Sequence, residues 1–70
     1  MNANEKMYNI TIGDKYKYYI TGKQWGEVID ILPPSQGDIK VRLRGGAVKC
    51  FGLYEVKNWL RDCILMIDNG

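Results

Sequence analysis

Apolar and polar residues alternate with a period of two along several short stretches of this 70-residue chain. The clearest stretch is residues 39–44, where apolar side chains would point to one face of a strand and cationic side chains to the other. The apolar set is Ile39, Val41 and Leu43, and the cationic set is Lys40, Arg42 and Arg44. Gly45 and Gly46 can supply the positive φ angles of a tight turn. The pattern therefore predicts a β-hairpin over residues 39–51.

Residues 15–21 and 25–32 predict two further strands, separated by a turn at residues 21–24. The first is rich in aromatic and β-branched residues, which favour strands. Its alternation would place one set of side chains in the core, with the hydroxyl groups at the rim. This set is Tyr16, Tyr18 and Ile20. The alternative is that residues 15–19 form a stacking platform beside the cationic side chains of residues 40–44. The second stretch is apolar on both faces, and Gly26 stands where a bulge or a sharp bend would help.

The end of the chain fits two different structures. Apolar positions recur at helical spacing, which predicts one amphipathic helix over residues 54–67. The alternative is a helical or 3₁₀ turn over residues 54–59, followed by a strand at residues 63–67. We favour the second structure, because Leu65 and Met66 would lie outside a narrow helical stripe.

The length and the spacing of these elements predict a single domain. We expect a flexible N-terminal lead-in at residues 1–7 and one domain over residues 8–70, beginning with a short strand or extended entry at residues 8–12. Several short strands separated by turns are typical of a β-sandwich or a small barrel. The chain is 46% hydrophobic with a formal net charge of +2, which is an ordinary globular composition.

Residue types that carry catalysis are scarce. The chain has no histidine, and its one serine, Ser35, lies in a proline-containing loop with no base to activate it. Two isolated cysteines, Cys50 and Cys63, cannot supply the four ligands of a structural zinc site. We therefore expect no enzyme, no metal, no cofactor and no small-molecule substrate.

The chain also shows no pattern that would direct it to a membrane. No apolar run approaches the roughly 18 residues that span a bilayer, and residues 1–6 lack the apolar stretch of a signal peptide. We expect a cytoplasmic protein with no membrane partner, in which both thiols are reduced and buried as small apolar groups.

Four short segments carry a family resemblance: IGD at residues 12–14, GEVI at 26–29, VRLRGG at 41–46 and FGLYE at 51–55. Together they resemble SH3-like barrels of the KOW and Tudor kind, and the short proteins of that architecture carried by phages and prophages. The resemblance covers residues 10–67 and implies a mainly β fold, a small five-stranded barrel with a helical or 3₁₀ turn near the C-terminus. Members commonly bind RNA, DNA, ribosomal or polymerase surfaces, or peptides.

Two candidate sites follow. The first is a cationic face whose side chains would lie about 6.6 Å apart along one side of a strand, close to the spacing of backbone phosphates. It consists of Lys40, Arg42, Arg44 and Lys49, with Tyr19 and Trp25 as candidates for stacking on bases. The alternative interpretation is a solvated outer face that protects a strand edge. The function we favour is that of a phage or prophage accessory protein that binds nucleic acid here.

The second candidate site is the apolar C-terminal segment, which would serve as a protein interface. A strand there would carry apolar residues on both faces, so one face needs a cover. The cover is either the core of the domain itself or a partner, which would be a second copy or a host or phage protein. The residues concerned are Trp59, Ile64, Leu65, Met66 and Ile67.

Overall fold

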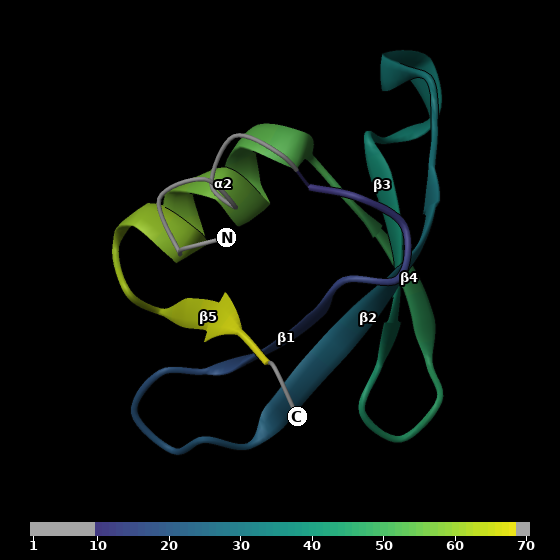
Figure 1. Ribbon diagram of the computed structural model, residues 1–70. Coiled ribbons are helices and arrows are strands. Elements are labelled where there is room, and N and C mark those ends of the chain that lie inside the picture. The colour runs from purple at the N-terminus through teal and green to yellow at the C-terminus, as the bar shows by residue number, and fades with distance from the viewer. Residues whose placement is uncertain (1–9, 69–70) are drawn as a thin grey trace.

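The computed structural model describes residues 10–68 and shows a mainly β fold, with five strands in one antiparallel sheet (Figure 1). The strands are β1 Lys15–Tyr18, β2 Gln24–Ile31, β3 Ile39–Leu43, β4 Val48–Phe51 and β5 Leu65–Ile67. The described helices are the 3₁₀ turn η1 Pro34–Gln36 and α2 Leu53–Arg61. The sheet order is β4-β3-β2-β1-β5, so β4 and β5 are its two edges and do not pair. The predicted mainly β class is confirmed, whereas a closed barrel stays a prediction.

The hairpin predicted over residues 39–51 is confirmed. It consists of β3 and β4, joined by a tight turn in which the amide of Gly46 donates to the carbonyl of Leu43 over 2.9 Å. Gly45 and Gly46 both have positive φ angles, 96° and 98°, which side chains other than glycine rarely adopt. The predicted role of the two glycines is therefore also confirmed.

The central strand β2 is bent by two β-bulges. Its pairing shifts by one residue against β1, where Trp25 is the extra residue, and again against β3, where Ile29 is the extra residue. Beside the first bulge, a Cβ atom on Gly26 would lie 2.7 Å from Cγ1 of Val41. The bend predicted at Gly26 is confirmed, and the bulge lets two consecutive residues, Trp25 and Gly26, both be buried.

The prediction for residues 15–21 is only partly right. Tyr16 is fully buried, as expected, but 41% of Tyr18 and 91% of Ile20 are exposed. The shift in pairing after Tyr16 breaks the simple alternation, and the strand ends at Tyr18, so residues 19–21 form a turn. The expected core face of three residues is therefore reduced to one.

The C-terminal part follows the favoured prediction, a helical segment and then a strand, although the helix has nine residues rather than one turn. Two carboxylates satisfy amide groups at the start of α2. Asp38 accepts a hydrogen bond from the Leu53 amide at 2.8 Å, and Glu55 accepts one from the Gly52 amide at 3.3 Å. These contacts supply acceptors that a helix N-terminus otherwise lacks.

A left-handed residue ends the helix and turns the chain toward β5. Cys63 has a φ angle of 59°, and the amide of Ile64 reaches back to the carbonyl of Trp59 over 2.9 Å. The amide of Cys63 donates to the carbonyl of Leu60, which completes a Schellman motif. β5 then pairs antiparallel with β1.

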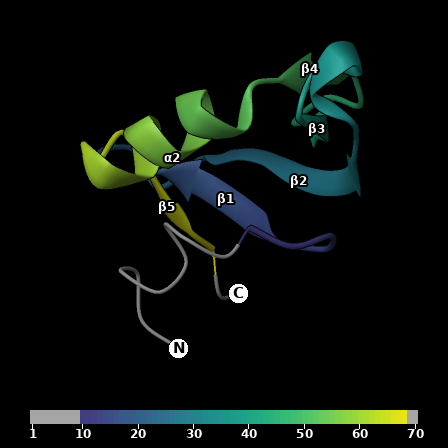
Figure 2. The same ribbon diagram turned by 90° about the horizontal axis from the view of Figure 1, so that it is seen from above.

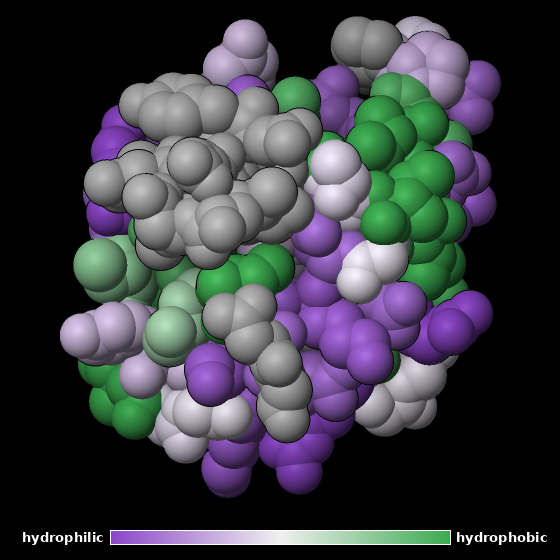
Figure 3. All heavy atoms as spheres, viewed as in Figure 1, coloured by the Kyte–Doolittle hydropathy of each residue, from purple (hydrophilic) through white to green (hydrophobic). Residues whose placement is uncertain are grey.

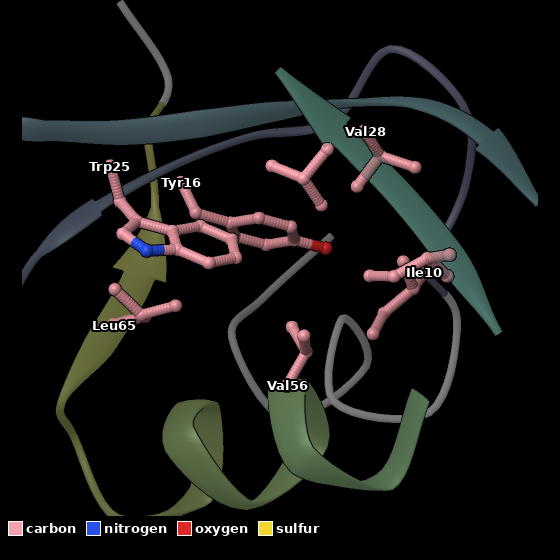
Figure 4. Packing of buried hydrophobic residues seen from close by; sticks show 8 residues of the cluster. Ile10, Tyr16, Trp25, Val28, Val56 and Leu65 are labelled. Atoms are coloured by element: carbon pink, nitrogen blue, oxygen red, sulfur yellow. The ribbon is translucent and has the colours of Figure 1, made fainter. Parts of the chain in front are cut away.

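The core lies between the bent sheet and α2, which runs along one side of the sheet (Figure 2). Val56 points from α2 toward the ring of Tyr16, and Trp25 and Leu65 lie at one end of the cluster (Figure 4). The buried residues are Ile10, Tyr16, Trp25, Val28, Ile39, Val41, Val56 and Leu65.

The short strand or extended entry expected at residues 8–12 lies only partly in the described residues, and residues 10–12 form no strand. Residues 8 and 9 lie outside the described part of the chain, as does the predicted lead-in at residues 1–7. Gly13 has a φ angle of 95°, and the carboxylate of Asp14 accepts hydrogen bonds from the amide and hydroxyl of Thr11. Across residues 10–68, neither helix is long and apolar enough to cross a membrane.

Candidate functional site

Two cations of the predicted cationic face lie opposite carboxylates on the neighbouring strand of the sheet. Arg42 on β3 is paired with Glu27 on β2, and Lys40 is paired with Asp30. Directly opposite residues of an antiparallel pair share a face, with Cβ atoms about 4.5–5.5 Å apart. The formal charges of these four residues therefore cancel, which weakens the attraction of β3 for phosphate, and Lys15 of β1 also lies opposite Glu27.

Lys49 does not belong to that face. It is paired with Val41, whose side chain is fully buried, so Lys49 projects from the opposite face to Arg42. The β4 residues that share the outer face with the two β3 cations are Val48 and Cys50. The prediction of four cations on one face is wrong, because the turn between β3 and β4 sets a register that exchanges the two faces of β4.

Arg44 lies apart from the other cations, beyond the end of β3. Its amide donates to the carbonyl of Trp25 over 3.0 Å, which extends the pairing of β2 and β3 by one residue. Its side chain lines a pocket of about 260 Å³ at the tips of the two hairpins. We call this the cationic pocket; it is lined by Tyr18, Lys23, Gln24, Trp25, Leu43 and Arg44.

A second pocket, of about 210 Å³, shares two of its aromatic residues with the first. We call it the apolar pocket, and the two pockets together the aromatic groove. The apolar pocket is lined by Tyr18, Trp25, Trp59, Ile64 and Leu65. Among the residues that line the two pockets in the described part of the chain, two are cations and none is a carboxylate.

Backbone pairing brings the groove residues together from distant parts of the chain. Tyr18 at the end of β1 is paired with Leu65 at the start of β5, and the amide of Tyr19 donates to the carbonyl of Ile64 at 3.1 Å. On the other side, the bond from Arg44 to Trp25 holds the β3–β4 turn against β2. The groove therefore rests on three connections of the same sheet.

Aromatic rings form the rear wall of the groove. The ring of Trp25 contacts those of Phe51 and Trp59, with centroid distances of 5.2 and 5.8 Å, and the ring of Tyr16 lies 6.5 Å away. Only 9% of Trp25 is exposed, so this predicted stacking residue acts mainly as a wall. The open ring in the groove is that of Tyr18, for which the sequence pattern favours a place in the core.

Tyr16 supports the wall from behind. Its hydroxyl donates to Oδ2 of Asp14 over 3.2 Å. Burial raises the pKa of this hydroxyl far above its ordinary value, and the neighbouring charge and hydrogen bond of Asp14 add to the effect. Tyr16 therefore stays neutral and packs with Trp25 across the physiological range of pH.

The residues of the predicted protein interface divide between the core and the surface. Leu65 belongs to the core, Trp59 joins the aromatic wall, and Met66 and Ile67 are half-buried opposite β1. Ile64 is 48% exposed at the rim of the groove. Pairing with β1 and packing in the core thus account for most of this segment.

Exposed apolar side chains gather in two other places. Tyr19 and Ile20 lie at the tip of the β1–β2 hairpin, next to the groove. Figure 3 shows apolar surface along the side of the molecule where β2, β3 and β4 lie, and Ile31 and Val48 of these strands are about half exposed. Both cysteine side chains are exposed, so the expectation that they are buried is wrong. Within residues 10–68, no cluster of three potential metal ligands occurs.

The chain finds no match among models of protein families, curated proteins or solved structures. The groove is therefore the feature that bears on function. The sequence pattern favoured a core position for Tyr18 over a stacking platform, and it did not indicate Lys23 and Gln24 as parts of the groove. The turn at residues 21–24 was the feature that could have pointed to them, since a lysine at a hairpin tip two residues before a buried tryptophan lies at the edge of the core.

Proposed function

We propose that the protein is a small non-catalytic domain that binds single-stranded nucleic acid in the aromatic groove. The observation that carries this proposal is the position of Tyr18, whose exposed ring borders both the cationic pocket and the apolar pocket. Lys23 and Arg44 lie on one side of this ring and Trp59 on the other. An open aromatic ring beside two cations is the combination that single-strand-binding surfaces use.

The chemistry of the groove favours unpaired bases over a duplex. A base stacked on an aromatic side chain contributes about 1–3 kcal/mol, and stacking requires a base face that a duplex keeps covered. Lysine and arginine side chains neutralise phosphates and release counterions, which gives binding its dependence on salt. Because the outer face of β2 and β3 has matched charges, it offers less to a phosphate backbone than the groove does.

The proposed site, the aromatic groove, shares only some residues with the cationic face that the sequence predicts. Arg44 and Trp25 stay in the site, Tyr19 flanks it, and Lys40, Arg42 and Lys49 leave it. The bulges of β2 support the finer expectation of an SH3-like barrel, since small barrels need bent strands at their corners. Phage or prophage origin remains a part of the proposal that rests on the resemblance alone, and a cytoplasmic location likewise stays a proposal.

The exposed tip of the β1–β2 hairpin favours a second candidate function, that of a protein-interaction module. Ile20 is 91% exposed, and Tyr19 and Ile64 extend the apolar surface toward the groove. A second copy or a host or phage protein would cover these side chains. Such binding would depend on buried apolar area and change little with salt, in contrast to nucleic-acid binding.

Tryptophan fluorescence tests the first function directly, because both tryptophans of the chain line the apolar pocket. Titration with oligothymidine of 12 nucleotides at low salt should quench the fluorescence in a saturable way, and a matched duplex should bind more weakly. Tyr18→Ala should lower the affinity for the single strand about tenfold, within the range of one lost stacking contact. The matched control is Tyr54→Ala, since Tyr54 is an exposed tyrosine on α2 that lines neither pocket.

Two results would remove this function. One is the absence of quenching at low salt, and the other is an equal loss of affinity in Tyr18→Ala and Tyr54→Ala. Circular dichroism of both variants verifies that the sheet is intact. Sedimentation at increasing protein concentration examines the second function, because a homodimer would appear as a mass that rises with concentration at any salt.

A further inference from the structure

The groove has two parts of different chemistry. The apolar pocket is lined only by aromatic and aliphatic side chains, whereas the cationic pocket contains Lys23, Arg44 and the amide of Gln24. Tyr18 and Trp25 line both, so a ligand that extends past Tyr18 meets an apolar surface on one side and cations on the other. A ligand that fits both parts therefore has a flat apolar portion joined directly to an anionic portion.

The apolar pocket suits a single ring system. Its volume of about 210 Å³ lies below the roughly 300–1,000 Å³ of pockets that enclose drug-sized ligands. Aromatic walls favour a flat ligand, since rings prefer offset stacking or edge-to-face contact. Trp25 and Trp59 already contact each other edge to face, with ring planes at 76°. Part of their aromatic surface is therefore covered, and the remainder offers room for one flat ring. Trp25 and Leu65 mark this end of the core in Figure 4.

The cationic pocket suits one phosphate group. Arginine can present two parallel N–H donors to phosphate oxygens, and lysine adds a compact positive charge. The cations of β3, Lys40 and Arg42, lie opposite Asp30 and Glu27, whereas Lys17 of β1 lies opposite Gln24 and Met66. A strand that leaves the groove along β3 would therefore meet matched charges rather than a continuing cationic track.

We infer that the groove recognises one nucleotide unit, with its base in the apolar pocket and its phosphate between Lys23 and Arg44. This inference rests on the proposed binding of single-stranded nucleic acid and narrows it to a ligand of one to two nucleotides. That unit sets the affinity. A longer strand offers more copies of the same nucleotide unit to the groove and makes no new contacts with the protein. The protein then marks an unpaired nucleotide or a strand end instead of coating a long single strand.

The salt dependence of binding separates this arrangement from an extended cationic surface. Each phosphate contact on a single strand contributes a slope of about −0.7 to log K against log salt, so one phosphate held between two cations predicts a slope of about −0.7. Tryptophan quenching is measured with thymidine, with thymidine 5′-monophosphate, and with oligothymidines of two to 12 nucleotides at several salt concentrations. We expect the monophosphate to bind at least threefold more tightly than thymidine, and affinity per site to level off by two nucleotides.

Charge-removing variants assign the contacts. Lys23→Gln and Arg44→Gln should each flatten the slope toward zero, since both side chains hold the same phosphate and either change weakens that contact. Lys40→Gln and Arg42→Gln carry the same change in charge on the outer face, and they should leave the slope unchanged. Circular dichroism shows whether each variant keeps the fold.

The outcomes distinguish this inference from the proposed function. Absence of quenching by every oligonucleotide overturns both. A second outcome is tight binding with a salt slope near −3 that becomes less steep in Arg42→Gln or Lys40→Gln. This outcome keeps the proposed function and overturns the single-nucleotide site. Equal affinity for thymidine and its monophosphate overturns the phosphate contact. If an acidic peptide with large side chains quenches the fluorescence as strongly as the nucleotides do, the ligand is not specifically a nucleotide.

Discussion

The outer face of β2 and β3 and the aromatic groove both carry cations, and they differ in the groups that lie beside those cations. On the outer face each cation lies opposite a carboxylate, as Arg42 does opposite Glu27. In the groove, Lys23 and Arg44 line the same pocket as Tyr18. A carboxylate within about 5 Å offsets the attraction of a cation for phosphate, whereas an aromatic ring adds a surface for stacking. A row of cations along a strand therefore predicts anion binding only once its partners across the sheet are known.

The largest expected effect comes from a substitution that disrupts the packing behind the groove and leaves the charges of both regions unchanged. Gly26→Val introduces a side chain where even a Cβ atom would lie 2.7 Å from Val41 and 2.9 Å from the carbonyl oxygen of Arg42. Overpacking of this kind costs about 1–3 kcal/mol or somewhat more. We expect the free energy of unfolding in urea to fall by about 3 kcal/mol, and the tryptophan emission of the folded protein to change as Trp25 moves.

A matched control for that variant is Gly52→Ala. A Cβ atom on Gly52 would meet its nearest neighbour at an ordinary 3.5 Å, and its φ angle is negative. Its free energy of unfolding should drop by less than about 1 kcal/mol, the scale of a weakened N-cap. If both variants lose the same stability, the bulge at Gly26 is not what holds Trp25 against the groove.

The second prediction concerns the hydroxyl behind the groove wall. In the unfolded chain Tyr16 ionises at about pH 10, whereas burial and Asp14 hold its pKa well above that value in the folded protein. The stability that comes from keeping the hydroxyl neutral is fully present below pH 10 and is lost above it, by about 1.4 kcal/mol per pH unit. Tyr16→Phe removes this loss, so its free energy of unfolding should decline less steeply than that of the wild type between pH 10 and 11.

Urea unfolding at pH 8, 10 and 11 measures this difference. At pH 8 the variant should be about 0.5–1.5 kcal/mol less stable, because it lacks the hydrogen bond to Asp14. Other tyrosines and lysines titrate in both proteins, and the comparison cancels their effect. Parallel declines in the two proteins would show that Tyr16 ionises as easily in the folded state as in the unfolded chain.

The smallest expected effect tests whether carboxylates are what prevent the outer face of β2 and β3 from binding phosphate. Glu27→Gln leaves Arg42 unmatched and raises the formal net charge from +2 to +3. The salt slope for oligothymidine should steepen by about 0.7, the value for one added phosphate contact, and affinity at low salt should rise a few-fold. The double variant Glu27→Gln with Arg42→Gln should return to the wild-type slope. An unchanged slope in Glu27→Gln would mean that the outer face lacks phosphate contacts for a reason other than charge.

Local patterns of the sequence were enough to predict several elements of the fold. The alternation in residues 39–43 and the two glycines that follow it determine a hairpin whatever surrounds it. The bend at Gly26 could also be anticipated, since a glycine within an apolar strand marks a bulge. The helical segment and the strand at the C-terminus were distinguishable because Leu65 and Met66 break the helical pattern.

The composition of the groove could not be predicted in the same way, because it depends on register. The extra residue at Trp25 turns the tryptophan into the core, and alternation alone does not place that residue. The turn after β3 decides that Lys49 shares a face with Val41 rather than with Arg42. The burial of Tyr18 was mispredicted for a different reason, since β1 ends at Tyr18, two residues before its apolar pattern does. The errors at Trp25 and Lys49 concern pairing, where a shift of one residue exchanges the faces of a strand.

The contact between Asp38 and the amide of Leu53 has a consequence for the order of folding. The two residues are 15 positions apart and lie on either side of the whole β3–β4 hairpin. A nine-residue helix is too short to be stable by itself in water, so α2 depends on this acceptor and on the core. We expect the hairpin to form first and the helix to follow. The amide hydrogens of α2 should then exchange with solvent at least as fast as those of β3 and β4, because α2 opens whenever the hairpin does.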